Sequence, residues 1–380
     1  MLNILITGGA GFIGSHTADA LVSEGHQVRV FDVLDPQIHG PDTSFPAYMN
    51  PAVDCIQGDI RDVDELTPAL EGIDVVYHFA SMTGVGQSMY DIRSYVDVNV
   101  TGTAALIEAI VKNKTRLTAF VLSSSRAVYG EGTHQCPAHG IIYPEPRRRE
   151  DMEDGRFDCY CPHCGSPLTS LPTSEDKPVQ PLSVYARTKL QQEELCEYAA
   201  HTFGLPVRIL RYFNVYGSRQ SLSNPYTGVV SIFFSRIKSG QPVYLYEHGK
   251  PGRDFVHVSD VVKANLQVIK STIKPGTCIN VGAGHEHTIA MIAAALGEAS
   301  GTVPDLQDRG EFRVGDIHSC YADLSRASSL LAYTPGISLE QGMREFAEWA
   351  GGQESVDLYQ QTVEELQRYN LFGRAGQTTA

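Results

Sequence analysis

Ser125, Tyr185 and Lys189 have the side-chain types and spacing of a proton-transfer site. Tyr185 and Lys189 lie on one face of a helix if the segment is helical, because side chains at i and i+4 are neighbours. An ammonium beside a phenol favours the phenolate, which can take a proton from an alcohol. A serine hydroxyl can hold the same oxygen. Since Tyr-x-x-x-Lys also occurs on ordinary surface helices, this pattern needs a second signal.

That second signal has the form of a dinucleotide site. A strand-like stretch at 2–7 ends in Thr7-Gly8-Gly9-Ala10-Gly11-Phe12-Ile13-Gly14 and passes directly into a helix. Glycines allow the tight turn, and a pyrophosphate can rest on the helix N-terminus. Asp32 ends the next strand, where a carboxylate accepts from a ribose and repels a 2′-phosphate, which favours NAD over NADP. Asp59 and Ile60 follow the third strand and are expected near the adenine.

The two signals reinforce each other. The charged ring of oxidised NAD favours a phenolate, as Lys189 does, so together they are expected to bring the pKa of Tyr185 from ~10 towards neutral pH. Hydride can then leave an alcohol carbon while Tyr185 takes the hydroxyl proton. The strand that ends in Ser123-Ser124-Ser125 must deliver the serine to this place.

Four of the eight cysteines fall in one segment and indicate a metal site. Cys136-Pro137-Ala138-His139-Gly140 and Cys161-Pro162-His163-Cys164-Gly165 look like the paired knuckles of a zinc ribbon. The expected ligands are Cys136, His139, Cys161 and Cys164, with Cys159 and His163 as spare candidates. Four protein ligands leave no open position, so the zinc would be structural and would stiffen a flap beside the catalytic residues. A flexible loop with free thiols is the alternative.

Strands and helices alternate in the first half of the chain. Apolar patterns predict strands at 2–7, 27–32, 53–56, 74–80 and 119–125, and helices near 12–24, 62–70 and 92–112. This alternation predicts an α/β fold with a doubly wound parallel sheet of the Rossmann type. The pattern breaks over 131–182 and resumes with a helix from Tyr185 to about His201. A strand at 206–216 follows, and further helices are expected near 229–239, 259–272, 287–299, 338–350 and 354–369.

The overall composition narrows the class of protein. The residues are 42% hydrophobic and 19% charged, which suits a globular chain with a sizeable core. A net charge of −14 argues against nucleic-acid binding. The run Arg147-Arg148-Arg149 is followed by Glu150-Asp151 and is expected to be a solvated loop face. No stretch reaches the ~18 apolar residues of a membrane span. Met1 runs straight into a strand without room for a signal peptide, so a cytoplasmic location is expected.

Taken in chain order, the motifs resemble the extended short-chain dehydrogenase/reductase family, which contains the NAD-dependent nucleotide-sugar epimerases and dehydratases. The resemblance covers nearly the whole chain. The matching segments are Thr7 to Gly14, His78-Phe79-Ala80-Ser81, Asn99-Val100-Thr101-Gly102-Thr103, Ser123 to Gly130, Tyr185 to Lys189, Arg211-Tyr212-Phe213-Asn214-Val215-Tyr216-Gly217, Arg253-Asp254-Phe255-Val256-His257 and Arg313-Val314-Gly315-Asp316.

The resemblance implies a catalytic triad of Ser125, Tyr185 and Lys189. Beyond the glycine turn, it implies contacts to NAD from Phe79, Ala80, Ser81, Asn99, Ser123, Tyr185, Lys189 and Tyr212. It implies contacts to a nucleotide-diphosphate sugar from Ser125, Asn214, Asn224, Arg253, Arg313 and Asp316. Guanidinium forks suit phosphate and an aspartate suits ribose hydroxyls, although a plain surface ion pair is the alternative for the last two. The resemblance also implies a homodimer formed through helices near 99–112 and 185–201, without nucleic-acid or membrane partners.

These assignments divide the chain into five parts. Residues 1–132 and 171–216 form the NAD-binding Rossmann domain, and 133–170 form the zinc-ribbon-like flap. Residues 217–350 are mainly a smaller nucleotide-sugar-binding domain, with 241–272 returning to the Rossmann domain, and 351–380 form a C-terminal helix and tail.

The residues after Ser125 bear on the reaction. Family dehydratases generally place an acid pair there, whereas this chain has Arg126-Ala127, and neither side chain can donate a proton at neutral pH. This favours a 4-epimerase that works through a transient 4-keto sugar, with NAD recycled in place. The flap together with Gln220-Ser221-Leu222-Ser223-Asn224-Pro225-Tyr226-Thr227-Gly228 resembles the dTDP-L-rhamnose 4-epimerases, which form the 6-deoxy-L-talose sugar. A UDP-glucose/UDP-galactose 4-epimerase, a 4,6-dehydratase with an unusual acid, and a non-catalytic NAD-binding interaction module remain open.

Overall fold

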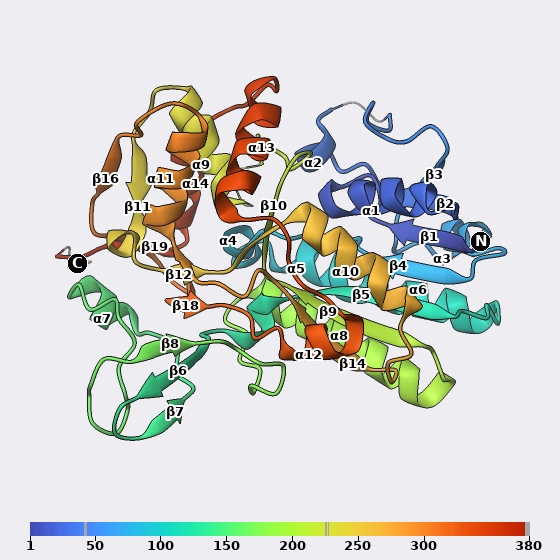
Figure 1. Cartoon of the computed structure of the whole chain (residues 1–380), viewed down its shortest axis with the longest axis horizontal. Helices are drawn as coiled ribbons and strands as arrows, with labels where there is room; N and C mark the ends of the chain where they lie inside the picture. The colour runs from blue at the N-terminus through green and yellow to red at the C-terminus, as the bar shows by residue number, and fades with distance from the viewer. Residues whose placement is uncertain (42–43, 225, 227, 377–380) are drawn as a thin grey trace.

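A seven-stranded parallel sheet forms the centre of the larger lobe (Figure 1). The structure is a computed structural model that describes residues 1–41, 44–224, 226 and 228–376. The strand order is β3-β2-β1-β4-β5-β9-β14, and every pairing is parallel. The strands are β1 (Asn3–Thr7), β2 (Gln27–Asp32), β3 (Asp54–Gln57), β4 (Val75–His78), β5 (Ala119–Ser125), β9 (Val207–Tyr212) and β14 (Thr277–Val281). The predicted doubly wound sheet is confirmed.

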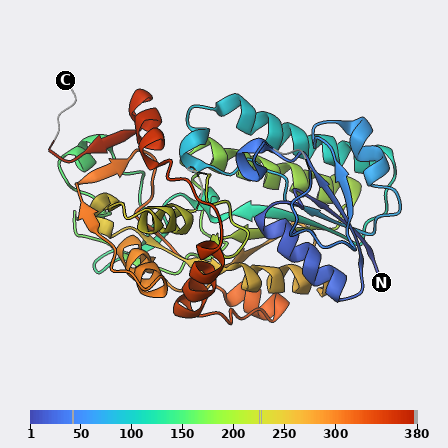
Figure 2. The same cartoon turned by 90° about the horizontal axis from the view of Figure 1, so that it is seen from above.

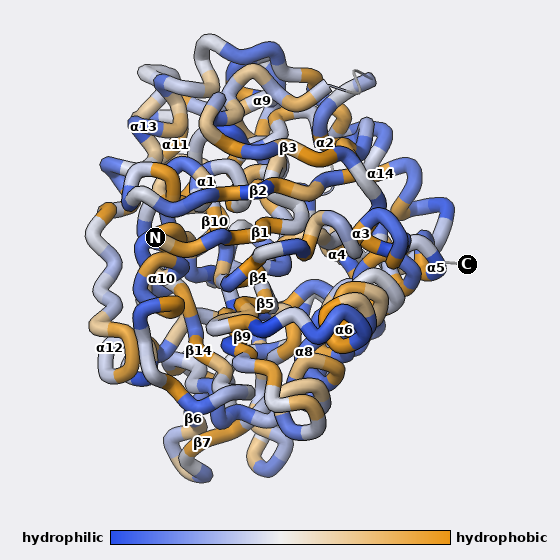
Figure 3. Tube along the Cα trace, turned by 90° about the vertical axis from the view of Figure 1, so that its right-hand side faces the viewer, coloured by the Kyte–Doolittle hydropathy of each residue, from blue (hydrophilic) through white to orange (hydrophobic). Residues whose placement is uncertain are grey.

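Helices cover both faces of this sheet, as Figure 2 shows. One face is packed by α1 (Phe12–Ser23), α10 (Val258–Lys270) and α12 (Ser325–Leu331). The other is packed by α3 (Val63–Ala69), α6 (Gly102–Lys112) and α8 (Val184–Phe203). The strands are apolar on both sides because parallel strands are covered on both faces, and Figure 3 shows them stacked in order through the lobe.

The catalytic helix α8 has well-defined ends. The Ser183 hydroxyl accepts from the Ala186 amide at 3.1 Å and caps its N-terminus. Gly204, in the left-handed conformation with φ 68°, ends the helix. The segment expected as one helix at 92–112 is instead α5 (Ile92–Tyr95), a π-helical turn η1 (Val96–Thr101) and α6. Other short elements of the larger lobe are α2 (Pro36–His39), α4 (Val85–Ser88) and η2 (Arg126–Tyr129).

The second lobe has its own apolar core between three helices, α9 (Val229–Lys238), α11 (Ile289–Ala299) and α13 (Leu339–Gly351). Four small sheets surround it: β10 (Asn214–Tyr216) with β13 (Phe255–His257); β11 (Val243–Leu245) with β16 (Leu306–Asp308); β12 (Gly252–Arg253) between β15 (His287–Thr288) and β18 (Ser319–Cys320); and β17 (Glu311–Arg313) with β19 (Phe372–Arg374). The turn η3 (Tyr246–Gly249) and helix α14 (Tyr359–Arg368) complete the lobe.

The chain returns to the central sheet later than expected. β11 pairs with β16 rather than with the central sheet, so the return is made by α10 and β14 and not by the whole of 241–272. The expected strand at 206–216 is divided into β9 and β10, and β14 was not foreseen.

The inserted flap carries a three-stranded antiparallel sheet at the lower edge of Figure 1. Its elements are β6 (Thr133–Cys136), β7 (Gly140–Ile142), α7 (Arg149–Glu153) and β8 (Thr169–Leu171). The expectation of a solvated face at residues 147–149 is wrong for Arg147 and Arg149, because the Arg149 side chain is only 19% exposed and that of Arg147 still less. The side chain of Arg148 is 79% exposed, whereas that of Arg147 is only 5% exposed. Sequence reasoning missed this because a run of like charges is usually solvated.

None of the helices that the structure describes is both long enough and apolar enough to cross a membrane.

Candidate active site

The turn after β1 can be built only with glycine. Gly8 has φ 69°, and a Cβ on it would lie 2.5 Å from the Ala80 amide nitrogen. A Cβ on Gly14 would lie 2.5 Å from the Gly8 carbonyl oxygen. The first turn of α1 has no side-chain cap from Gly11, so its amides are free to face an anion. This backbone cradle fits the pyrophosphate of a dinucleotide.

A cavity of about 1790 Å³ opens above this turn along the carboxyl ends of the strands. In a doubly wound sheet this edge is where ligands bind. The cavity wall contains the predicted residues Gly8, Gly11, Phe12, Ile13, Gly14, Asp32, Asp59, Ile60, Phe79, Ala80, Ser81, Ser123, Ser125, Tyr185, Lys189 and Tyr212. The structure therefore brings together, around one cavity, segments that are far apart in the sequence.

Asn99 is the predicted cofactor residue that does not line the cavity. Its side chain is fully buried. Its Oδ1 accepts from the Met82 amide at 2.8 Å, and its Nδ2 donates to the Thr188 hydroxyl at 2.9 Å. Asn99 thus ties the loop after β4 to the catalytic helix, which makes it a positioning residue in this structure.

Asp32 and Asp59 both line the cavity, but their carboxylates have different hydrogen-bond partners. The two carboxylate oxygens of Asp32 accept from the amides of Ala10 at 3.0 Å and Leu34 at 2.9 Å, which fixes the side chain at the end of β2. Asp59 is instead held by Arg61, whose hydrogen bonds lower the pKa of this carboxyl. His39 and Tyr48 also line the cavity, from a short helix and a loop, and no motif in the sequence points to either of them.

Ser125, Tyr185 and Lys189 converge at one end of this cavity. Ser125 ends β5, and its hydroxyl is close enough to the Tyr185 phenol to lower the pKa of that group. The Lys189 Nζ donates to the Ser123 carbonyl at 2.9 Å and lies 6.0 Å from the centroid of the Tyr185 ring. A phenol beside a serine hydroxyl, at the end of the cavity, is suited to exchange a proton with an alcohol.

The acidity of Tyr185 in the protein alone differs from the expectation. Burial raises the pKa of Tyr185, and the Ser125 hydroxyl and the positive charge of Arg126 offset this only in part. Burial also lowers the pKa of Lys189 to about 7, which weakens the cation expected to stabilise the phenolate. The predicted lowering of the tyrosine pKa is therefore not a property of the protein alone. The sequence analysis did not assign Arg126 this electrostatic role.

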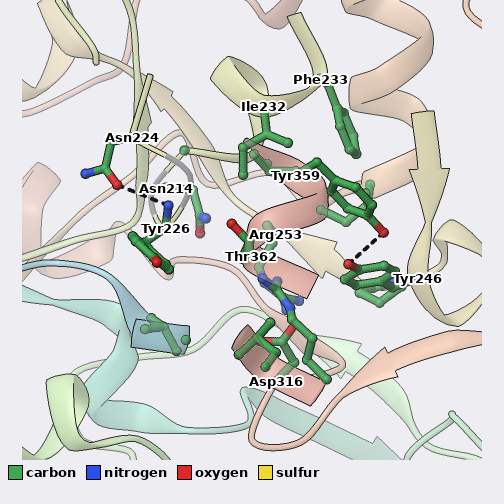
Figure 4. A pocket seen from close by; sticks show the side chains of 18 of the residues that line it. Asn214, Asn224, Tyr226, Ile232, Phe233, Tyr246, Arg253, Asp316, Tyr359 and Thr362 are labelled. Carbon is green, nitrogen blue, oxygen red and sulfur yellow. Dashed lines mark hydrogen bonds and ion pairs between the residues drawn. The ribbon is translucent and has the colours of Figure 1, made fainter. Parts of the chain in front are cut away.

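A second, smaller cavity of about 240 Å³ meets the first where Arg126, Asn214 and Asn224 line both. Figure 4 shows its wall, with Arg253 and Asp316 facing Tyr246 and Tyr359, whose hydroxyls lie 2.9 Å apart. Its upper wall comes from α14 and the segment before it.

Polar atoms are in place for a ligand in this second cavity. Among the described residues, Asn214 Oδ1 is buried and has no hydrogen-bond partner. Arg313 and Asp316 form an ion pair of 2.8 Å in the wall of the cavity, and Asn224 Oδ1 accepts from the Tyr226 amide at 3.1 Å. Arg126 forms no hydrogen bond or ion pair with the part of the chain that the structure describes. Pro225 and Thr227 of the nearby motif lie outside the described residues.

The flap brings the four predicted metal ligands together. The ligand atoms of Cys136, His139, Cys161 and Cys164 all lie within 4.8 Å of one another. The sulfurs of Cys136 and Cys164 are 3.6 Å apart, and His139 Nδ1 is 3.5 Å from the sulfurs of both Cys136 and Cys161. Cys159 is part of a different buried group, with Glu131 and His134.

Comparisons with known proteins place the chain in a family. Residues 4–149 and 161–282 match the NAD dependent epimerase/dehydratase family. A dTDP-L-rhamnose 4-epimerase of Burkholderia thailandensis is 35% identical over 91% of this chain and 94% of its own. A putative UDP-glucose 4-epimerase of Methanocaldococcus jannaschii is 30% identical over 91% and 97%. The structure of a UDP-glucuronic acid 4-epimerase from Bacillus cereus, in complex with UDP-glucuronic acid and NAD, superposes with a TM-score of 0.76 at 29% identity, over 92% of this chain and 99% of that one.

A dinucleotide cradle at the strand ends, beside a serine and a tyrosine, defines an NAD-dependent enzyme of the short-chain dehydrogenase/reductase type. The chain belongs to the NAD dependent epimerase/dehydratase family.

Proposed function

We propose that this enzyme inverts the configuration at C4 of a nucleotide-diphosphate sugar, and that dTDP-L-rhamnose, converted to dTDP-6-deoxy-L-talose, is its substrate. The observation that carries the proposal is that Tyr185 and Ser125 line the larger cavity, while Arg126, which follows Ser125 in the chain, lines both cavities. The larger cavity suits the dinucleotide and the smaller one a nucleotide diphosphate, so the sugar between them lies at the phenol.

In this mechanism the chain's own groups move one proton and hold one oxygen. The glycine turn after β1 would hold NAD, which would supply a hydride acceptor and donor for C4. Tyr185 takes the C4 hydroxyl proton as the C–H bond breaks, and gives it back when the 4-keto sugar is reduced. Ser125 holds the C4 oxygen in both directions. Between the two transfers the 4-keto sugar must rotate, and Asn214 and Arg253 hold the nucleotide end while it does so.

The residues beside Ser125 support epimerisation over dehydration. Loss of water needs a group that donates a proton to the leaving hydroxyl. Arg126 and Ala127 line both cavities at this point, and neither can donate a proton at neutral pH. The relative with 35% identity supports the rhamnose substrate, and the relative with 30% identity keeps a UDP-hexose as the second candidate.

A panel of dTDP-L-rhamnose, UDP-glucose and UDP-galactose, with the product followed by proton NMR, tests the substrate. We expect a new sugar with an inverted H4 coupling pattern from dTDP-L-rhamnose. Turnover of the UDP-hexoses without turnover of dTDP-L-rhamnose would overturn the narrow assignment and leave the C4 chemistry standing. A 4-keto-6-deoxy product absorbing in base would overturn the epimerase.

We also propose that the flap binds one structural zinc through Cys136, His139, Cys161 and Cys164. Tetrahedral zinc with bonds of ~2.3 Å to sulfur sets ligand sulfurs roughly 3.8 Å apart, and the 3.6 Å between Cys136 and Cys164 fits this edge. Elemental analysis of the purified protein tests the proposal, with one zinc per chain expected. A fully active preparation free of transition metal would contradict it.

A homodimer is the third part of the proposal. Apolar side chains are exposed on α5, at the start of η1 and on α8: Ile92 is 52% exposed, Val96 39%, Tyr198 60% and Phe203 52%. The rings of Tyr198 and Phe203 lie together, with centroids 6.0 Å apart, and exposed apolar groups that lie together mark protein interfaces. Light scattering should give twice the mass of one chain, and Tyr198→Glu should shift it towards a single chain.

A further inference from the structure

Arg147 of the flap contacts residues in the wall of the smaller cavity. It lies in the segment between β7 and α7, and its guanidinium is almost fully enclosed. Nη1 and Nη2 both bind the Glu247 carboxylate in η3. Nη2 also donates to the Asp316 carbonyl and Nη1 to the Phe157 carbonyl, each at 2.8 Å. One side chain of the flap therefore contacts two segments that line the smaller cavity.

A second carboxylate, that of Glu131, links Arg147 to the start of β18. The Arg147 Nε lies 3.4 Å from Glu131 Oε1. Glu131 in turn accepts from the amides of His318 at 2.7 Å and Ser319 at 3.2 Å. The backbone from Asp316 to Ser319 is thus held from the flap side by Arg147 and Glu131.

Arg253 holds the same backbone from the cavity side. Its Nη2 donates to the Ile317 carbonyl at 2.7 Å and its Nη1 to the His318 carbonyl at 3.0 Å. A displacement of this backbone would therefore move Arg253 and Asp316 together, and both line the cavity.

The backbone of Glu247 also needs an external support. Glu247 and His248 have φ values of 51° and 60°, a region that non-glycine residues rarely adopt. Such conformations persist when surrounding contacts hold them in place. The Glu247 carboxylate is almost fully buried and pairs with Arg147, so the flap supplies this support.

We propose that Arg147 is a positioning residue for the nucleotide-diphosphate end of the substrate, so that the flap sets the affinity of the smaller cavity. The inference rests on the proposed function of that cavity. Without the guanidinium, Glu131 and Glu247 would lose the cation between them, and Glu247 lines the cavity proposed for an anionic diphosphate. Repulsion and the released backbone would both weaken binding, while the proton transfer at Tyr185 would remain intact.

The test compares Arg147→Met, Arg147→Lys and the control Arg148→Met in the full-length protein. Arg148 is a neighbour in sequence but is exposed and pairs with Asp151. Calorimetry with dTDP and with UDP measures binding to the smaller cavity, and steady-state kinetics separates KM from kcat. For Arg147→Met we expect at least a tenfold weaker affinity and a tenfold higher KM, with kcat within about threefold and NAD content unchanged. Arg147→Lys keeps the charge without the planar fork, so its nucleotide affinity and KM should lie between those of the parent enzyme and of Arg147→Met.

A merely structural role would give a different pattern. Arg147→Met would then lower the thermal midpoint and the active fraction, while the folded remainder bound dTDP or UDP as the parent does, and the inference would be overturned. An equal loss of dTDP or UDP affinity in Arg147→Met and Arg148→Met would also overturn the inference. If the parent enzyme binds neither nucleotide, the proposed function fails, which is distinct from a variant that matches a parent that does bind.

Discussion

The central sheet and the flap hold their functional residues by different forces. A large cluster of buried, mainly aliphatic side chains lies on each face of the sheet. The glycine turn, Asp32 and Ser125 lie at the carboxyl ends of its strands. In the flap, the buried cluster consists of Cys136, Ile142 and Cys161, with Leu168 packed against it. Two of these side chains are proposed metal ligands. Hydrophobic burial positions the first region, whereas we expect the second to depend on polar contacts, the proposed zinc and the small apolar cluster of Met152, Phe157 and Phe312.

This contrast assigns the proposed proton transfer to the central sheet and the control of substrate affinity to the flap. The groups that move protons lie on a helix and strands whose geometry is over-determined by packing. The flap residue that contacts the wall of the smaller cavity, Arg147, lies outside the central sheet, so we expect its release to leave the sheet folded. The following four predictions test that division.

Tyr185→Phe removes the proposed acid/base group and should have the largest effect. We expect kcat to fall by about 10³-fold or more, since general acid–base catalysis contributes roughly 10²–10⁴-fold. The fold and NAD binding should be retained because the ring still packs in α8. Tyr198→Phe, on the exposed face of the same helix, is the control and should be fully active. Comparable activity in the two variants would exclude Tyr185 as the catalytic group.

Gly8→Ala should damage the cofactor site through the backbone. The added Cβ meets the Ala80 amide nitrogen at 2.5 Å in a conformation with φ 69°. We expect NAD affinity, measured by fluorescence quenching, to fall at least tenfold. Gly25→Ala carries a comparable penalty, with φ 82° and no atom within 4 Å, but lies away from the cavity. Equal loss of NAD affinity in both would show that general destabilisation, and not the cradle, is responsible.

Cys161→Ser should act on the flap and spare the sheet. We expect loss of the bound zinc and faster proteolysis within residues 133–171, because the flap has little apolar core to replace the metal. NAD content should match that of Cys55→Ser, whose thiol lies in β3. Mass spectrometry of the fragments locates the cuts. Cleavage spread evenly over both lobes would argue that the two regions are one cooperative unit.

Arg126→Met should give the smallest change, a displaced pH profile. Arg126 lowers the pKa of Tyr185, so its removal raises that pKa. Because the phenolate is the active base, the acid limb of kcat should move to higher pH, by up to about one pH unit. Arg187→Met, on the exposed side of α8, should leave the profile in place. A shift to lower pH would contradict the electrostatic role.

Short sequence motifs predict most residues of the candidate site. The remaining features depend on contacts between segments that are distant in the sequence. The glycine turn, the strand-end serine and the two pairs of proposed metal ligands each depend on short spacings, so the sequence contains their local geometry. Arg147 was misjudged because its partners Glu131 and Glu247 are distant in sequence. The strand β14 was missed because five residues, Thr277–Val281, carry too short a pattern. The raised pKa of Tyr185 could not be foreseen, since it depends on how completely the fold encloses the ring.

The position of β14 has a consequence for synthesis on the ribosome. This edge strand pairs with β9, yet the second-lobe elements from β10 to β13 lie between the two strands in the sequence. Six strands of the sheet therefore emerge first and must wait, with the edge of β9 open, until residue 281 has left the exit tunnel. An open edge of this kind is a template for wrong pairing. Synonymous codons that slow translation between β9 and β14 should therefore increase aggregation of the nascent chain.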